Sequence, residues 1–165
     1  MSDRLCLYYS RTGNTRAAAE KVAELLEAEL VELTDGKARG GILGFLASGL
    51  DAMRKTPQEL LPFQTEQPWG TYDDVMVATP VWAGRCSSIV HAFLAAYGRE
   101  LPQKVSYIVT HMGVSSYNEV CTQMDQYLAA PHKFALSLQP KAADYHQKLY
   151  DFVRAVSGEE AETQL

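Results

Sequence analysis

The segment Ser10-Arg11-Thr12-Gly13-Asn14-Thr15 joins a strand-like run, Leu5–Tyr9, to a helical pattern over Asn14–Glu29. The run carries no charge, as expected for a strand that is buried on both faces of a parallel sheet. The second segment repeats apolar residues at helical spacing, namely Ala19, Val22, Ala23 and Leu26. The sequence therefore predicts a strand, a short polar loop and a helix, in that order.

The rest of the chain repeats this alternation. Further strands are predicted over Leu30–Leu33, Val75–Thr79, Val105–Thr110 and Phe134–Leu138. Further helices are predicted over Ser87–Gly98, with Gly98 at the C-cap, over Asn118–Ala130 before Pro131, and over Ala142–Val156. Strands that alternate with helices imply right-handed crossovers and a parallel sheet. The expected class is α/β: a doubly wound five-stranded sheet inside a three-layer α/β/α sandwich.

Length and charge limit the other possibilities. The chain has 165 residues, which is one domain, and a net charge of −5. An acidic chain without a basic run is a poor candidate for binding nucleic acid or an anionic membrane surface. The three cysteines, Cys6, Cys86 and Cys121, form no CxxC pair, which excludes a zinc ribbon and a disulfide scaffold. Reduced thiols lead us to expect a cytoplasmic protein.

The first loop has the chemistry of a phosphate site. The first N–H groups of a helix have no partner inside the helix, and the helix dipole attracts an anion to them. Ser10, Thr12 and Thr15 add hydroxyl donors, and Gly13 lets the backbone approach a ligand closely. The alternative is an ordinary helix start capped by Ser, Thr or Asn.

Other phosphate motifs do not fit the spacing of this loop. A Gly-Lys-Ser/Thr element is absent, which excludes a P-loop NTPase, and no GxGxxG dinucleotide fingerprint is present. Cys6 and Arg11 lie one position too close for the Cys-x5-Arg loop of a cysteine phosphatase. We therefore expect Cys6 to be a core residue.

The second candidate loop follows the third strand and reads Thr79-Pro80-Val81-Trp82-Ala83-Gly84-Arg85. A tryptophan beside Pro and Gly at the mouth of a sheet suits a planar ligand, because flat rings stack on indole. Gly84 would let backbone groups reach the edge of that ring. The alternative is that Trp82 packs under a neighbouring loop.

These two loops together carry a family resemblance. Ser-x-Thr-Gly-x-Thr after the first strand resembles the FMN phosphate loop of flavodoxins, and Thr-Pro-Val-Trp-Ala-Gly resembles the loop around the isoalloxazine ring in flavodoxin-like proteins. The resemblance implies a flavodoxin-like domain over 1–157 with strand order 2-1-3-4-5, bound FMN, and an acidic C-terminal tail over 158–165. The segment Gly40–Pro57 is similar to one branch of short flavodoxin-like proteins. It is expected to be an amphipathic helix on the sheet, or else to cover the flavin or form a dimer.

By the same resemblance, the loop after the fourth strand flanks the other side of the flavin. His111 would bond a ring carbonyl, Gly113 would present backbone N–H groups, and Tyr117 would stack. The cofactor-binding residues implied in all are Ser10, Arg11, Thr12, Gly13, Asn14, Thr15, Thr79, Pro80, Val81, Trp82, Ala83, Gly84, Arg85, His111, Met112, Gly113 and Tyr117. The other histidines show no metal-ligand spacing, so no metal site is expected.

Arg85 departs from the family pattern, because many relatives are apolar or contain proline just after this glycine. A cation near the pyrimidine end of the ring would favour an anionic reduced flavin and therefore an enzyme; the alternative is a solvated surface arginine. Cys86 lies near a predicted helix N-terminus, a position that can lower the pKa of a thiol.

The expected function is electron transfer by an FMN protein, in which the flavin carries out the redox chemistry and no catalytic side chain is required. The alternative is a NAD(P)H-dependent FMN reductase of quinones or flavins. A third class would keep the fold and bind another anion without flavin. The implied partners are a redox protein, a small quinone or NAD(P)H, and both a monomer and a homodimer remain open. The net negative charge would steer the protein towards basic redox partners.

Overall fold

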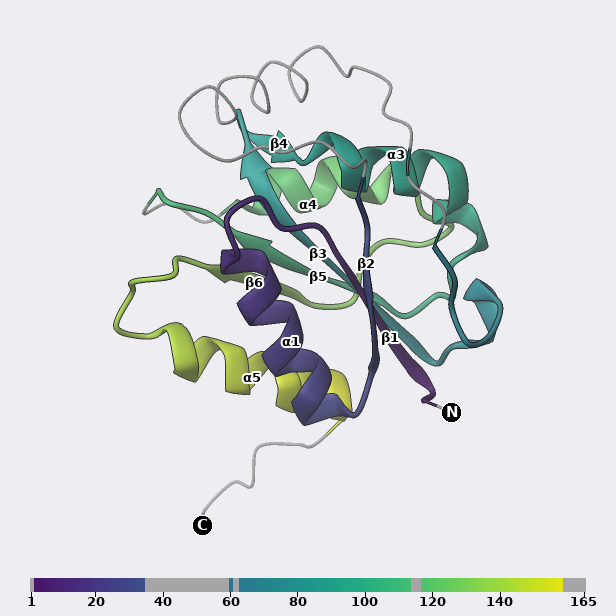
Figure 1. Cartoon of the computed structure of the whole chain (residues 1–165), viewed down its shortest axis with the longest axis horizontal. Coiled ribbons are helices and arrows are strands. Elements are labelled where there is room, and N and C mark those ends of the chain that lie inside the picture. Colours follow the sequence, from purple (N-terminus) through teal and green to yellow (C-terminus); the bar gives the residue numbers. More distant parts are fainter. Residues whose placement is uncertain (1, 35–59, 61–62, 114–116, 159–165) are drawn as a thin grey trace.

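The computed structural model describes residues 2–34, 60, 63–113 and 117–158, which form a parallel sheet between two helical layers (Figure 1). The strands are β1 (Arg4–Tyr8), β2 (Glu29–Glu32), β3 (Asp74–Trp82), β5 (Val105–Thr110) and β6 (Ala135–Leu138). They lie in the order β2-β1-β3-β5-β6, and every neighbouring pair in this order is parallel. This is the predicted order 2-1-3-4-5, and the predicted fold class is confirmed.

Two hydrophobic clusters hold the layers together. Helices α1 (Asn14–Leu26) and α5 (Tyr145–Ser157) cover one face of the sheet, and α3 (Ser88–Tyr97) and α4 (Asn118–Asp125) cover the other (Figure 1). Successive residues of β1 point to opposite faces, so Leu5 and Leu7 belong to the cluster under α3 and α4, while Cys6 belongs to the cluster under α1 and α5. Cys6 is fully buried, as expected for a core residue.

The structure extends the third strand beyond its predicted end. Pro80 led the sequence analysis to end this strand at Thr79, but β3 continues to Trp82 and turns back as a two-residue strand, β4 (Arg85–Cys86). Val81 pairs with Cys86 and Trp82 with Arg85 in an antiparallel hairpin. Proline tolerates extended backbone but has no N–H to donate. It therefore ends the pairing of a central strand only at a position where the neighbouring strand requires a donor. The sequence did not predict β4.

Three predicted helices are shorter than expected. The first was predicted to reach Glu29, but α1 ends at Leu26, because its C-cap Glu27 takes a left-handed backbone with φ +53°. The fourth helix was predicted to reach Ala130, but α4 ends at Asp125 because the next three residues make i→i+3 bonds, as in Gln126 N–H to the Gln123 carbonyl at 3.4 Å. The last helix begins at Tyr145 and not at Ala142, since the chain first makes a turn in which Ala142 donates to Gln139 at 3.0 Å. Gly98 stands at the C-cap of α3 as predicted.

Two predicted segments, Gly40–Pro57 and nearly all of the tail over 158–165, lie outside the described residues. Within the part of the chain that the structure describes, no helix is long and apolar enough to cross a membrane. The same residues contain no group of three or more metal-ligating side chains.

Candidate functional site at the carboxyl ends of the strands

The three loops chosen from the sequence meet in one pocket at the carboxyl ends of the strands. Parallel strands bring their carboxyl ends to a common edge, and the order β2-β1-β3 places a switch point there. The pocket is lined by Arg11, Thr12, Asn14, Thr15, Pro80, Val81, Trp82, Thr110, His111, Met112 and Pro140. Its volume is about 70 Å³, so a ligand larger than a few atoms would enter it only in part and lie across the surrounding loops.

The first loop ends in a helix start that no side chain caps. Gly13 is the N-cap of α1, with φ +100° and no side-chain hydrogen bond to the first turn. Its own N–H donates to the Ser10 hydroxyl at 3.0 Å, which shapes the loop. The ordinary capped start, the alternative raised by the sequence, is therefore not what forms. The first amides of α1 are left to meet an anion, and no acidic residue lies in the first turn to repel one.

Gly13 is also needed for its backbone conformation. A φ of +100° is strained for residues with a side chain, and a Cβ added there would meet nothing within 4 Å. The space above this residue is thus open, and the amides of the first turn can be approached closely.

Thr15 points inward and bonds a residue that the sequence analysis missed. Its hydroxyl lies 2.6 Å from the hydroxyl of Thr110, the last residue of β5, and both are buried. A hydroxyl donates only one hydrogen, so one threonine of the pair keeps a hydrogen to offer to the pocket. The expected role of Thr15 as a phosphate donor therefore involves Thr110, because the two hydroxyls share a hydrogen bond.

The second loop is a tight hairpin whose base is fixed by Thr79. The Thr79 hydroxyl accepts the N–H of Ser87 at 2.9 Å, and the Ser87 hydroxyl in turn accepts the N–H of Val90 at 3.1 Å as the N-cap of α3. Ala83 and Gly84 form the turn with φ +50° and +75°, the combination of a two-residue hairpin loop. Thr79, Ala83 and Gly84 thus build the hairpin and do not line the pocket.

Trp82 is packed into the core as well as lining the pocket. Only 3% of its surface is exposed, and its ring stands edge-on to Tyr9, with centroids 5.3 Å apart and planes at 87°. The structure thus places Trp82 in the packed arrangement that the sequence left open as the alternative to a stacking wall. An open apolar side chain is instead provided by Met112, which is 69% exposed at the same pocket.

The third loop is held by His111, whose two ring nitrogens are both engaged. Nδ1 lies 2.7 Å from the Gly113 carbonyl and Nε2 lies 2.7 Å from the Ser137 hydroxyl of β6. Burial is the largest cause that lowers the pKa of His111 below its ordinary value. The sequence expected this imidazole to bond a ring carbonyl of the ligand, but its hydrogen-bonding atoms serve the protein.

Tyr117 packs on the third loop from outside the pocket. Its ring lies 4.4 Å from the ring of His111, centroid to centroid, at an angle of 46°. A Cβ on Gly113 would lie 2.5 Å from the Tyr117 hydroxyl, so the Tyr117 side chain packs closely over this backbone position and would shift to admit a larger residue. Neither Gly113 nor Tyr117 lines the pocket.

Three basic residues occur in the loops that form the pocket or adjoin it. Arg11 lines it, Arg85 pairs with the pocket residue Trp82, and Lys141 follows the pocket residue Pro140. The described loop residues 10–13, 80–87, 110–113 and 139–143 include no acidic residue. The net charge of −5 is therefore not carried by these loops.

Burial makes the Cys86 thiol a weak acid. Burial raises its pKa to about 12, and the neighbouring charge of Arg85 offsets this only in part. The sequence analysis raised the alternative that the nearby helix N-terminus lowers the pKa of the Cys86 thiol, but burial raises it instead. All three cysteines are free, and burial raises the pKa of Cys6 to about 12 and that of Cys121 to about 11.

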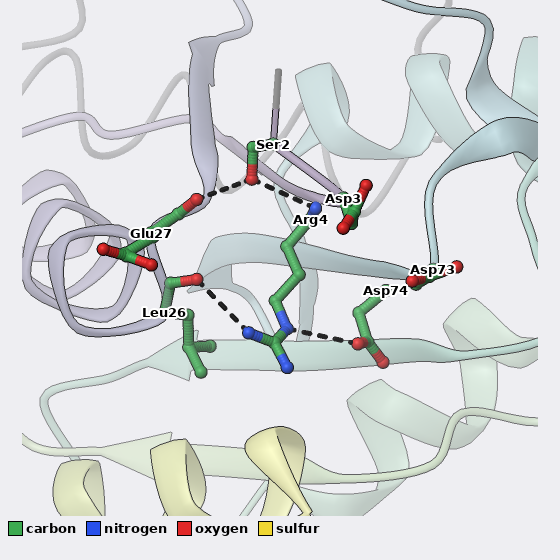
Figure 2. A pocket seen from close by; sticks show the side chains of 7 residues that line it. All are labelled: Ser2, Asp3, Arg4, Leu26, Glu27, Asp73 and Asp74. Carbon is green, nitrogen blue, oxygen red and sulfur yellow. Dashed lines mark hydrogen bonds and ion pairs between the residues drawn. The ribbon is translucent and has the colours of Figure 1, made fainter.

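A second and larger pocket, of about 450 Å³, lies at the opposite ends of the strands (Figure 2). It is lined by Ser2, Asp3, Arg4, Leu26, Glu27, Asp73 and Asp74. Figure 2 shows the Arg4 guanidinium between the Asp74 carboxylate and the Leu26 carbonyl, at 3.3 and 3.4 Å. The bonds of Ser2 and Arg4 tie the start of the chain to α1 and β3. The carboxylates of Asp3, Glu27 and Asp73 make the pocket acidic and unsuited to an anion, so we regard it as a structural contact.

Nine of the seventeen predicted site residues line the first pocket: Arg11, Thr12, Asn14, Thr15, Pro80, Val81, Trp82, His111 and Met112. Ser10, Gly13, Thr79, Ala83, Gly84, Arg85, Gly113 and Tyr117 shape or flank it. The sequence analysis missed Thr110 and Pro140. The rule that ligands gather at strand carboxyl ends could have identified both, because Thr110 ends one predicted strand and Pro140 follows another.

Neither a family model nor a curated protein sequence matches the chain. Solved structures do match. A flavoprotein in complex with FMN from Lactobacillus acidophilus NCFM is 18% identical, with 92% of this chain and 99% of that chain covered and a TM-score of 0.70. A flavodoxin, WrbA-like protein from Agrobacterium tumefaciens is 16% identical over 96% of this chain and 97% of that chain, with a TM-score of 0.58.

A third similar structure is the apo form of an NADH:FMN oxidoreductase. It is 13% identical, with 98% of this chain and 91% of that chain covered and a TM-score of 0.57. At these identities the likeness concerns the fold. Together with the strand order and the pocket at the switch point, it establishes that this protein has the flavodoxin-like fold.

Proposed function

We propose that the protein binds FMN in the pocket at the carboxyl ends of its strands and transfers electrons through it. The observation that carries this proposal is the uncapped start of α1, where Gly13 leaves the first amides open beside the hydroxyl-lined pocket. A structurally similar flavoprotein was solved with FMN, which supports the choice of ligand.

The residues present fit the two ends of this cofactor. Thr12 and Asn14 are exposed, line the pocket and lie next to the open amides, so they would hold the phosphate together with the helix dipole. Hydrogen bonds to a charged group contribute about 1.5–3 kcal/mol each, so a few of them hold a phosphate without a lysine. The ring would lie across the rim, against Met112 and the hairpin that carries Trp82.

The chain's own groups have binding roles and not acid–base roles. When bound, FMN supplies the redox chemistry, because its ring accepts and returns electrons. The two ring nitrogens of His111 are engaged within the protein, and burial keeps the Cys86 thiol protonated. The described pocket therefore offers neither a general base nor a nucleophile, which agrees with electron transfer.

The second candidate function is that of an NAD(P)H-dependent FMN reductase of quinones or flavins. The cations around the pocket favour it, because Arg85 and Lys141 would attract the phosphates of a nicotinamide dinucleotide. An NADH:FMN oxidoreductase is among the structures similar to this chain. The same cations would favour an acidic redox protein over a basic one, which reverses the steering expected from the net charge.

The experiment is a titration of the purified protein with FMN, followed by NAD(P)H. We expect saturable quenching of FMN fluorescence at one equivalent per chain. No quenching up to about 1 mM FMN, where binding would be worth only about 4 kcal/mol, would overturn the proposal. Rapid NAD(P)H oxidation in the presence of a quinone would favour the reductase, and reduction only by a protein or chemical donor would favour the carrier.

A further inference from the structure

His111 stands at the junction between the sheet and the third loop. It follows directly after β5, its backbone N–H donates to the Leu138 carbonyl of β6 at 2.9 Å, and 9% of its surface is exposed. The residue lines the pocket, but its ring nitrogens are both bonded to the protein. Its part in the site must therefore act through what it holds.

The geometry determines where the imidazole proton lies. A carbonyl oxygen only accepts, so Nδ1 must carry the hydrogen in its 2.7 Å bond to Gly113. Burial favours the neutral ring, in which Nε2 has a lone pair and accepts from the Ser137 hydroxyl. The side chain thus links a carbonyl two residues along the loop to a strand 26 residues away.

This link determines the position of Met112. Met112 lies between His111, whose N–H is bonded to the Leu138 carbonyl, and Gly113, whose carbonyl is bonded to the His111 ring. The carbonyl of Met112 itself accepts a hydrogen bond from the Gln139 side chain at 3.1 Å. Tyr117 packs on the imidazole and against Gly113 from the outer side. The most exposed large apolar side chain among the described residues is therefore carried on a loop that is tied down from both sides.

We propose that His111 is a positioning residue, which clamps residues 111–113 to Ser137 so that Met112 lies against the ring of the bound flavin. This inference rests on the proposed function. It assigns the imidazole a part in binding the ring end of the ligand, without contact between its nitrogens and the ligand. Methionine suits this contact, since its thioether packs well against the face or edge of an aromatic system.

Three variants separate the parts of the clamp. His111→Phe keeps a ring against Tyr117 and removes both hydrogen bonds. His111→Asn keeps a donor at the position of Nδ1 and loses the bond to Ser137. Ser137→Ala removes the same bond from the other side, and so serves as the matched control for His111→Asn.

The measurements are dissociation constants for FMN and riboflavin, together with amide exchange of Met112 and Gly113 in the ligand-free protein. We expect His111→Phe to weaken the binding of both ligands alike, by about tenfold, because both hydrogen bonds that hold the loop are lost. His111→Asn and Ser137→Ala should weaken both ligands by a smaller and similar factor. Adding Ser137→Ala to His111→Phe should change nothing further.

Amide exchange decides the proposal even without a ligand. We expect exchange at Met112 and Gly113 to accelerate in His111→Phe, while exchange in the core of β5 stays slow. Unchanged exchange at these two amides, or unchanged dissociation constants in a folded His111→Phe protein, would overturn the clamp. A wild-type protein that shows the clamp by exchange but binds no flavin would overturn the proposed function alone.

Discussion

The two ends of the same strands form pockets of opposite character. At the amino ends, Asp3, Glu27, Asp73 and Asp74 surround a single arginine that is already bonded to a carboxylate and a carbonyl. At the carboxyl ends, the described loops bring hydroxyls, a glycine, an uncapped helix start and Arg11 together, and the same loops carry Arg85 and Lys141. The larger pocket is lined mainly by carboxylates, which accept hydrogen bonds, and the smaller one leaves donors open. The smaller pocket, and not the larger one, therefore has the chemistry that suits an anion.

The largest expected effect comes from removing donors at the carboxyl end. Thr12→Ala combined with Asn14→Ala should weaken FMN binding by about 100-fold or more, since two hydrogen bonds to a charged phosphate are lost. Riboflavin, which lacks the phosphate, should lose less than about threefold. Fluorescence titration of both ligands measures this difference, and equal losses would contradict a phosphate site at α1.

A change at the amino end should affect stability and leave ligand binding intact. Arg4→Met removes a partly buried ion pair with Asp74, so we expect the free energy of unfolding to fall by about 1 kcal/mol at most. The FMN dissociation constant should stay within about twofold of wild type, because this pocket lies at the other ends of the strands. Chemical denaturation measures the change in stability, and titration measures the FMN dissociation constant. Weaker FMN binding in Arg4→Met would contradict the separate roles of the amino-end and carboxyl-end pockets.

The cations at the carboxyl end should be visible in salt dependence. With FMN bound, reduction of ferricyanide, an anion, should slow several-fold from low salt to about 0.5 M, where the Debye length falls to a few ångströms. Reduction of an uncharged quinone should change little. The double variant Arg85→Gln with Lys141→Gln should flatten the ferricyanide curve in stopped-flow measurements. Acceleration with salt would show that the acidic residues elsewhere dominate the field.

The smallest effect is a pH dependence assigned to one residue. Burial lowers the pKa of His111 in the folded state, with Lys148 acting in the same direction. The unfolded chain then binds the proton more tightly, so stability should fall as the pH drops from about 6.5 towards the folded pKa. Chemical unfolding at several pH values measures how the free energy of unfolding depends on pH. The part of this dependence that His111 causes should disappear in His111→Phe. A slope that persists would assign it to another group.

The sequence predicted the fold and the place of the site for one physical reason. Alternating strands and helices determine a parallel sheet, and a parallel sheet brings the loops after its strands to one edge. Thr12, Trp82 and His111 could therefore be assigned to a common pocket although they are far apart in the chain.

The directions of the side chains could not be predicted in the same way. Trp82 faces the core because Tyr9 stands edge-on to it, Thr15 turns inward because Thr110 offers a hydroxyl, and His111 is bonded to Ser137. Each partner lies on another strand or loop, and periodicity along one segment carries no information about it. The hairpin at Ala83 and Gly84 could not be predicted for a related reason. A proline in the sequence of one segment indicates the end of a strand, whereas β3 continues past Pro80 to Trp82.

The most direct test of the account asks which end of the sheet meets FMN. We predict that titrating FMN into the ¹⁵N-labelled protein shifts the amide signals of Gly13, Asn14 and Thr15 most, and also shifts those of Gly84, Arg85 and Met112, all with the same dependence on FMN concentration. The signals of Asp3, Arg4 and Asp74 should not move. Shifts confined to those amino-end residues, or no shifts at saturating FMN, would contradict the central claim.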